Sequence, residues 1–358
     1  MFKKKTGIYA LALAMAMTGM TGCGSSGSSS ESATKAAVTT EEVSGAATDN
    51  TNSESFSVVC TIFPEYDWVK EILGDHADNT ELTYLLDNGV DLHSYQPTAD
   101  DMLKISTCDL FIYVGGESDK WVEDALADTQ NKDIKVVNLM EVLGDSAKAE
   151  ELKEGMQGED EHDHDHDDHD HDDHEHEEGE EEYDEHVWLS VKNAKVLCAE
   201  IEKNIEAIDP ANASDYKANL DSYTAKLSDL DNSFQKLVDG SSVKALVFGD
   251  RFPFRYFVDD YGLDYYAAFI GCSAETEASF ETIAFLSDKV KELDCKTIFT
   301  LENSSKDIAD TIISTSGKSV DIAELNSLQS VSEDDISKGA TYISLMQKNY
   351  DVLSEALK

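Results

Sequence analysis

Short apolar runs alternate with stretches of helical periodicity along most of the chain after residue 56. The runs are rich in β-branched and aromatic residues, whereas the stretches between them repeat apolar side chains every three or four positions. This alternation predicts parallel β-sheets covered by helices. Because about 300 residues exceed what a single hydrophobic core usually supports, we predict an α/β fold with two lobes. The predicted strands are 57–63, 82–86, 110–115, 135–140, 243–248, 265–270, 296–301 and 319–323.

One long amphipathic helix is predicted between residues 212 and 238. Its apolar residues recur at spacings of 4, 3, 4, 3, 4 and 3 positions, and they are Tyr216, Leu220, Tyr223, Leu227, Leu230, Phe234 and Leu237. Such a stripe suits packing across both lobes, with a coiled-coil partner as the alternative. We therefore predict an N-terminal lobe at 56–205, a rigid linker helix at 206–240 and a C-terminal lobe at 241–358, with a ligand cleft between the lobes.

The first residues have the composition of an export signal. Three lysines at 3–5 precede an apolar run at 8–17, which is shorter than the roughly 18 residues that indicate a membrane span. Cys23 ends the sequence MTGC, which is typical of a signal cleaved before a cysteine that is then acylated. We predict a signal peptide at 1–22, lipidation of Cys23 and a disordered tether at 23–55, which is too polar to form a core. A tether with an end-to-end distance of roughly 30 Å would hold the body at the outer face of the cytoplasmic membrane.

The chain is strongly acidic, with 74 acidic residues against 28 basic ones and a formal net charge of −46. Such a surface repels nucleic acid and attracts cations. Many of the acids lie in 159–188, EDEHDHDHDDHDHDDHEHEEGEEEYDEHVW, which overlaps a predicted loop at 145–185. We predict that this loop is too polar to form the tight site and that its histidines bind metal weakly beside it; a solubilising acidic loop is the alternative. These histidines are His162, His164, His166, His169, His171, His174 and His176.

Ten histidines are present, and none follows His186. His76 lies at a predicted helix end, where the dipole favours a cation, and we interpret it as structural. His93 lies in a loop after the second strand, whereas His186 lies where the acidic segment meets a helix, so a folded boundary holds it. Asp250 and Glu302 each follow a strand of the second lobe. Ligands bind beyond the carboxyl ends of parallel strands. His93, His186, Asp250 and Glu302 are therefore candidate metal ligands, and helix capping is an equal alternative for the two acids.

Several segments carry a resemblance to a known family. DNGVDLHSYQPTADDM, DEHVWLSVKNAK, the long helix, and VFGDRFPFRYFVDDYGL followed by FTLENSSKDIADTI resemble the zinc and manganese substrate-binding lipoproteins of ABC transporters, cluster A-I, over nearly everything from residue 56. The resemblance implies metal ligation by His93 and His186, a histidine-rich loop of the zinc type, and an ABC permease with its ATPase as partners. We expect a monomer that is not an enzyme.

The segment after the first strand of the second lobe departs from that family. Zinc receptors of this kind offer a histidine there, whereas this chain has Gly249 or Arg251, depending on the gap. A guanidinium cannot ligate a cation because it stays protonated, so Asp250, Glu302 or a loop histidine is left to complete the shell. Two imidazoles with carboxylates suit zinc and also manganese. The histidine-rich loop favours zinc as the transported ion, with manganese or nickel as alternatives.

The sequence lacks the signature motifs of several enzyme classes. The zinc-hydrolase motif HExxH, the GxSxG elbow and a Walker phosphate loop are absent from the sequence. A zinc hydrolase is therefore the weaker rival, and a surface adhesin or passive metal buffer is a third alternative. Five widely spaced cysteines besides Cys23 predict buried thiols with at most two disulfides. They are Cys60, Cys108, Cys198, Cys272 and Cys295.

Deletion of residues 159–182 tests the interpretation of the acidic segment. Because the segment is expected to supply only weak sites, the variant should keep one tight zinc site and lose several weak ones. Isothermal titration calorimetry of the full chain and the variant counts both kinds of site. Disappearance of the tight site from the variant would mean that the segment itself holds the ion.

Overall fold

The structure, a computed structural model, describes residues 55–158 and 182–358. Its strands are β1 (Ser57–Cys60), β2 (Glu81–Tyr84), β3 (Leu110–Tyr113), β4 (Lys135–Asn138), β5 (Ala245–Val247), β6 (Arg251–Phe252), β7 (Asp264–Tyr266), β8 (Phe269–Ile270), β9 (Thr297–Leu301) and β10 (Asp321–Leu325). Its α-helices are α1 (Phe63–Leu73), α2 (Ala99–Thr107), α3 (Trp121–Ala127), α4 (Leu139–Leu143), α5 (Val191–Ile208), α6 (Ala213–Gly240), α7 (Arg255–Tyr261), α8 (Phe280–Glu292), α9 (Asp307–Ser316), α10 (Glu333–Ser337) and α11 (Tyr342–Ala356). Short 3-10 turns are η1 (Gly74–Asn79), η2 (Leu92–Ser94), η3 (Glu117–Asp119), η4 (Gly144–Ser146), η5 (Val187–Leu189) and η6 (Pro210–Asn212).

Four parallel strands form the sheet of the N-terminal half, in the order β2-β1-β3-β4. Val58 of β1 pairs with Leu82 of β2 on one side and with Leu110 of β3 on the other. The central strands β1 and β3 are buried at nearly every position, as expected for parallel strands covered by helices. Because all four strands run in one direction, the loops that follow them meet at one edge of the sheet.

Parallel strand pairs also make up the C-terminal half, where β5 pairs with β7, β6 with β8 and β9 with β10. A parallel bridge between Phe248 and Phe299 connects the β5 and β9 pairs. The predicted strand 265–270 is divided into β7 and β8. The reason is that the Asp250 carbonyl accepts from the N–H groups of Ala268 and Phe269 at 3.0 and 3.4 Å, and the chain then pairs with β6 instead of β5.

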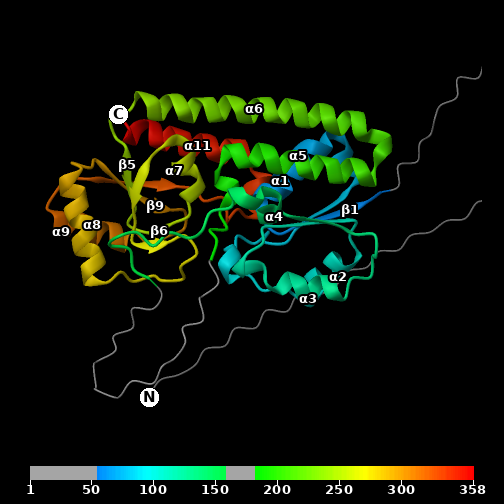
Figure 1. Cartoon of the computed structure of the whole chain (residues 1–358), viewed down its shortest axis with the longest axis horizontal. Coiled ribbons are helices and arrows are strands. Elements are labelled where there is room, and N and C mark those ends of the chain that lie inside the picture. The colour runs from blue at the N-terminus through cyan, green and yellow to red at the C-terminus, as the bar shows by residue number, and fades with distance from the viewer. Residues whose placement is uncertain (1–54, 159–181) are drawn as a thin grey trace, which may run out of the picture. The chain divides into compact units, whose positions relative to one another are not determined.

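The long helix α6 connects the two halves, and in Figure 1 it runs along α5 and α11. It packs against α1 and α5 of the N-terminal half and against α7 and α11 of the C-terminal half. Its buried side chains follow the predicted stripe except at the end, where Val238 is buried and Leu237 is only partly covered. A strict spacing of 3.5 residues drifts around a helix with 3.6 residues per turn, which explains the one-residue shift. The stripe therefore packs within the chain, as the first of the two alternatives predicted.

The helix α11 returns to the N-terminal half and bonds to residues of that half. The main-chain N–H of Tyr342 donates to Asp67 on α1 at 2.8 Å, and the Tyr342 hydroxyl donates to the carbonyl of Trp188 at 2.7 Å. The Trp188 indole in turn donates to the carbonyl of Ser327 at 2.8 Å. These bonds are buried and join the two halves independently of α6. The predicted fold class, α/β with parallel sheets joined by one long helix, is confirmed; the exact lobe boundaries stay predictions.

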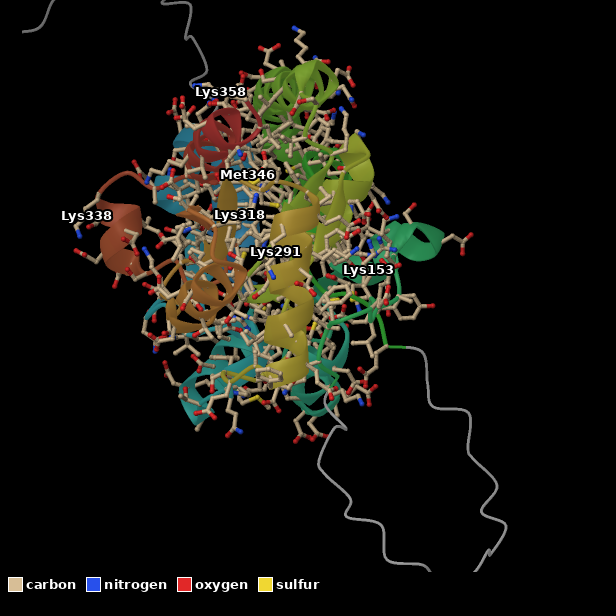
Figure 2. All side chains as sticks on the ribbon, turned by 90° about the vertical axis from the view of Figure 1, so that its left-hand side faces the viewer. Lys153, Lys291, Lys318, Lys338, Met346 and Lys358 are labelled. Atoms are coloured by element: carbon tan, nitrogen blue, oxygen red, sulfur yellow. The ribbon has the colours of Figure 1, made fainter. Side chains whose placement is uncertain are left out.

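The lysines at the end of the molecule that carries α8 and α9 are paired with acids. Figure 2 looks onto this end, and the five lysines that it labels all form ion pairs. The pairs are Lys153–Asp264, Lys291–Asp288, Lys318–Asp294, Lys338–Asp334 and Lys358–Glu355. Exposed pairs contribute little to stability. Their main effect is to neutralise the positive charge of these lysines.

Non-covalent packing holds the described part of the chain together. The five cysteines in residues 55–158 and 182–358 are free thiols, three buried and two partly exposed, within the predicted limit of at most two disulfides. Within the same ranges, no helix combines the length and the apolar character needed to cross a bilayer. Cys23 and the predicted signal and tether lie outside the described residues.

Glu65, near the start of α1, is a fully buried acid. Its Oε2 accepts from the main-chain N–H groups of Thr61 and Ile62 at 2.8 and 3.2 Å, whereas its Oε1 has no partner. Burial, and then the charge of Asp119, raises the pKa of Glu65 to about 8. The group is therefore protonated in the folded chain at neutral pH and ionised in the unfolded chain.

Substitution of Glu65 by Gln should flatten the pH dependence of stability. A raised folded pKa gives a contribution that is complete below the unfolded value near 4.5 and is lost by the time the pH reaches about 8. Between pH 5.5 and 7.5 the free energy of unfolding of the wild type should therefore fall more steeply than that of Glu65→Gln, by up to about 1.4 kcal/mol per pH unit. Urea unfolding measures both slopes. The same change at exposed Glu81 should keep the wild-type slope; equal slopes for Glu65→Gln and the wild type would contradict the argument.

Candidate metal centre

His93 is held in the turn η2, which follows β2. The Asp91 side chain caps this turn by accepting from the main-chain N–H of His93 at 3.0 Å. On the imidazole, Nδ1 lies 2.8 Å from the Ser118 hydroxyl oxygen and 3.5 Å from Oε2 of Glu185. In the tautomer with the proton on Nδ1, the Ser118 oxygen accepts it, and the lone pair on Nε2 is directed away from Ser118.

His186 lies at the boundary between the acidic segment and η5, and its side chain is fully buried. Oδ1 of Asp184 accepts from the main-chain N–H of His186 at 2.8 Å and lies 3.0 Å from Nδ1. A carboxylate beside Nδ1 favours the tautomer with the lone pair on Nε2, and the same arrangement orients metal-binding histidines in general.

The two free nitrogens face each other, with 3.2 Å between Nε2 of His93 and Nε2 of His186. The ring centroids are 5.2 Å apart. Two nitrogens bound to one tetrahedral zinc ion, each at about 2.0–2.1 Å, lie roughly 3.3–3.4 Å from each other. The structure thus brings together the two histidines predicted as ligands, at a separation that one ion can bridge.

Burial favours the uncharged imidazoles that a metal requires. It lowers the pKa of His186 to about 4, and burial together with the charge of His186 lowers the pKa of His93 below its usual range. Burial also raises the pKa values of Asp184 and Glu185 to about 7 each. Oδ2 of Asp184 and Oε2 of Glu185 are buried without a hydrogen-bond partner. A cation between the rings would offset the cost of these buried acids.

Cys272 completes a cluster that the sequence did not predict. A nitrogen of His93, a nitrogen of His186 and the Cys272 sulfur lie within 4.8 Å of one another, and no other such group of His, Cys, Asp or Glu atoms occurs in the described ranges. Cys272 follows β8 at its carboxyl end. The available signal was its place just after the predicted strand 265–270, but widely spaced cysteines in apolar segments had indicated packing instead.

Asp250 and Glu302 are not brought into this cluster. The carboxylate of Asp250 accepts from the main-chain N–H groups of Arg251 and Leu301 at 2.9 and 3.0 Å. Both oxygens of Glu302 accept from Ser327, at 2.7 Å from its N–H and 2.6 Å from its hydroxyl. Both acids line a cavity of about 360 Å³ that also reaches Asp91. Their role as ligands stays a prediction.

Arg251 is an ion-pair partner of Asp91, which joins the second half of the chain to the His93 turn. Burial by itself raises the pKa of Asp91, but Arg251 and His93 outweigh this effect and hold the pKa below its usual range. In the amide orientation that satisfies both of its ends, Gln329 donates to the two Asp91 oxygens at 2.9 and 3.0 Å. Its own oxygen then accepts from Nε2 of His186 at 2.6 Å, so this nitrogen gives up its proton when a metal ion binds to it.

The other histidine of the described residues is structural, as predicted. His76 Nε2 lies 3.0 Å from Asp215 of α6, and its ring packs edge-on against Tyr216 with centroids 5.3 Å apart. The seven histidines predicted as a weak metal loop, His162 to His176, lie outside the described residues.

Two parallel-sheet halves, one long connecting helix and facing imidazoles where the halves meet define the class of metal-receptor substrate-binding proteins. The chain belongs to the family described as zinc-uptake complex component A, periplasmic (ZnuA), whose family model matches residues 58–356. The resemblance found in the sequence is therefore confirmed.

Individual relatives agree with this assignment. The chain is 31% identical to the high-affinity zinc uptake system protein ZnuA of Bacillus subtilis. The alignment covers 100% of this chain and 99% of that protein. The chain is also 31% identical, over 84% of its length, to the zinc-binding lipoprotein AdcA of Streptococcus pneumoniae, and it spans only 55% of that relative. The crystal structure of the Zn(II)-bound ZnuA-like domain of AdcA matches 85% of this chain and 99% of that domain with a TM-score of 0.63 and 27% identity.

Substitution of Asp184 by Asn should weaken zinc binding by about 10–100-fold, the usual effect of altering a carboxylate that orients a metal-binding histidine. The amide can still accept from Nδ1 of His186, but it lacks the charge that makes the imidazole a stronger donor. Competition with a zinc chelator measures the affinity. Asp67→Asn changes another buried acid, outside the cluster, and should bind like the wild type. Equal affinity of Asp184→Asn and the wild type would contradict this role.

Proposed function

We propose that this chain is the substrate-binding component of an ABC importer, which captures a zinc ion between its two halves and passes it to a permease. The observation that supports this most directly is the 3.2 Å approach of two Nε2 atoms, each with its Nδ1 committed to oxygen acceptors. His93 and His186 are the proposed ligands. The names of the relatives, a zinc-uptake protein and a zinc-binding lipoprotein, favour the same cargo.

We propose zinc and not manganese as the cargo because the two proposed ligands are imidazoles. Imidazole suits zinc, whereas manganese prefers oxygen, and the two acids predicted as ligands have other hydrogen-bond partners. Manganese or nickel is the alternative cargo for a receptor of the same type.

The proposed setting is the outer face of the cytoplasmic membrane. There the acylated Cys23 and the tether 23–55 would anchor a monomer close to a permease and its ATPase. We propose the lobe division 56–205, 206–240 and 241–358 for this body, with the loop 145–185 feeding ions to the cleft. The family is one of metal-binding transport receptors and not of enzymes, and we propose that the chain has no catalytic activity.

Substitution of His93 or His186 by Ala should abolish tight zinc binding in the full chain. Each change removes one of two facing donors and leaves the other unable to chelate. Metal analysis and calorimetric titration with zinc, manganese and nickel measure the loss and the preference. His76→Ala is the matched control, since His76 is bound to Asp215 on α6 and should leave the tight site intact. Retention of the tight ion in both His93→Ala and His186→Ala would overturn the proposed function.

A further inference from the structure

The Cys272 sulfur is the atom that the C-terminal half contributes to the described ligand cluster. Sulfur and nitrogen ligands of a tetrahedral zinc ion, at about 2.3 Å and about 2.0–2.1 Å from the metal, lie roughly 3.5–3.6 Å apart. The cluster atoms lie within 4.8 Å of one another. The sulfur would therefore have to move toward the imidazole nitrogens by about 1 Å at most, which a rotation of the Cys272 side chain can provide.

The loop that carries this cysteine is built against the His186 ring. A Cβ atom added at Gly271 would lie 3.0 Å from Cε1 of His186 and 3.0 Å from the carbonyl oxygen of Phe252. The absence of a side chain at Gly271 therefore lets the backbone approach the ring closely, with the cysteine at the next position. The main-chain N–H of Cys272 donates to Oε1 of Glu150 at 3.2 Å, which fixes the loop from its other side.

Cys272 is partly exposed, whereas Cys60, Cys108 and Cys198 are buried. A packing role explains the three buried thiols, but it does not explain a partly exposed thiol close to nitrogens of two imidazoles.

We propose that the Cys272 thiolate is the third protein ligand of the cargo ion and that this sulfur makes the site select zinc over manganese. This inference rests on the proposed function, since it concerns the same ion at the same two histidines. On binding, the thiol proton leaves to solvent and the sulfur lone pair forms the bond to the metal, so no redox partner is needed. Selection follows because thiolate suits zinc and is a poor ligand for manganese.

X-ray absorption at the zinc edge tests the ligand directly. The full chain is loaded with less than one equivalent of zinc so that the ion occupies only the tight site. The wild type should show one sulfur neighbour at about 2.3 Å, and Cys272→Ser should show only nitrogen and oxygen at about 2.0–2.2 Å, with zinc affinity at least about 10-fold lower. Cys295→Ser is the matched control, because Cys295 is also a partly exposed free thiol and lies outside the cluster. It should keep the sulfur neighbour.

Alkylation with N-ethylmaleimide tests the same contact without a substitution. In the wild-type chain, zinc should protect Cys272 at least about 10-fold against modification while Cys295 reacts at the same rate with and without the metal, as followed by peptide mass analysis. For selectivity, Cys272→Asp should lower the ratio of zinc to manganese affinity by at least about 10-fold, because it replaces sulfur with oxygen.

The outcomes separate this inference from the proposed function. Tight zinc that requires His93 and His186 but shows no sulfur neighbour, and no protection of Cys272, would overturn the cysteine ligand and leave the receptor function in place. Tight zinc that persists in His93→Ala and His186→Ala would overturn the receptor site itself. A sulfur neighbour in the wild type that survives Cys272→Ser would also overturn the assignment of this cysteine.

Discussion

The opposed lone pairs of two imidazoles are the constraint on which the candidate centre depends. Nε2 of His93 and Nε2 of His186 are 3.2 Å apart, and each ring is fixed by an acceptor on its Nδ1. Two lone pairs at this distance repel each other unless a cation or a proton lies between them. Burial lowers the pKa values of both histidines and so keeps the rings uncharged, which is the form that binds a metal. Without a metal, a proton on one Nε2 relieves the repulsion, and in the proposed function a zinc ion takes its place.

Negative charge around the rings works in the same direction. Asp184 and Glu185 are buried beside the histidines, and one oxygen of each has no hydrogen-bond partner. In a poorly solvated site such groups are costly without a positive charge nearby. Arg251 contributes a positive charge near His186, but it is already paired with Asp91. The region therefore favours a cation without being neutralised by the arginine, which explains how an arginine can lie close to a metal centre.

The packing of the two halves against each other helps to set the positions of the His93 and His186 rings. Trp188, two residues after His186, donates to Ser327 in the second half, and its carbonyl accepts from Tyr342 on α11. The same helix donates to Asp67 on α1. These buried bonds, together with α6, hold the two halves together beside the segment that carries His186.

Periodicity and strand order in the sequence by themselves determined the α/β class, the long helix and the two histidines, because amphipathic spacing and a position at the end of a strand are local properties of the chain. They did not reveal Cys272 or Gln329, whose significance depends on distances to residues far away in the chain. Local pattern left Asp250 and Glu302 open between capping and ligation, and the tertiary structure places hydrogen-bond donors against both acids while their role as ligands stays a prediction. The two halves of the chain form their sheets from different segments. Only the packing of these halves in the folded chain decides which side chains line the same cavity.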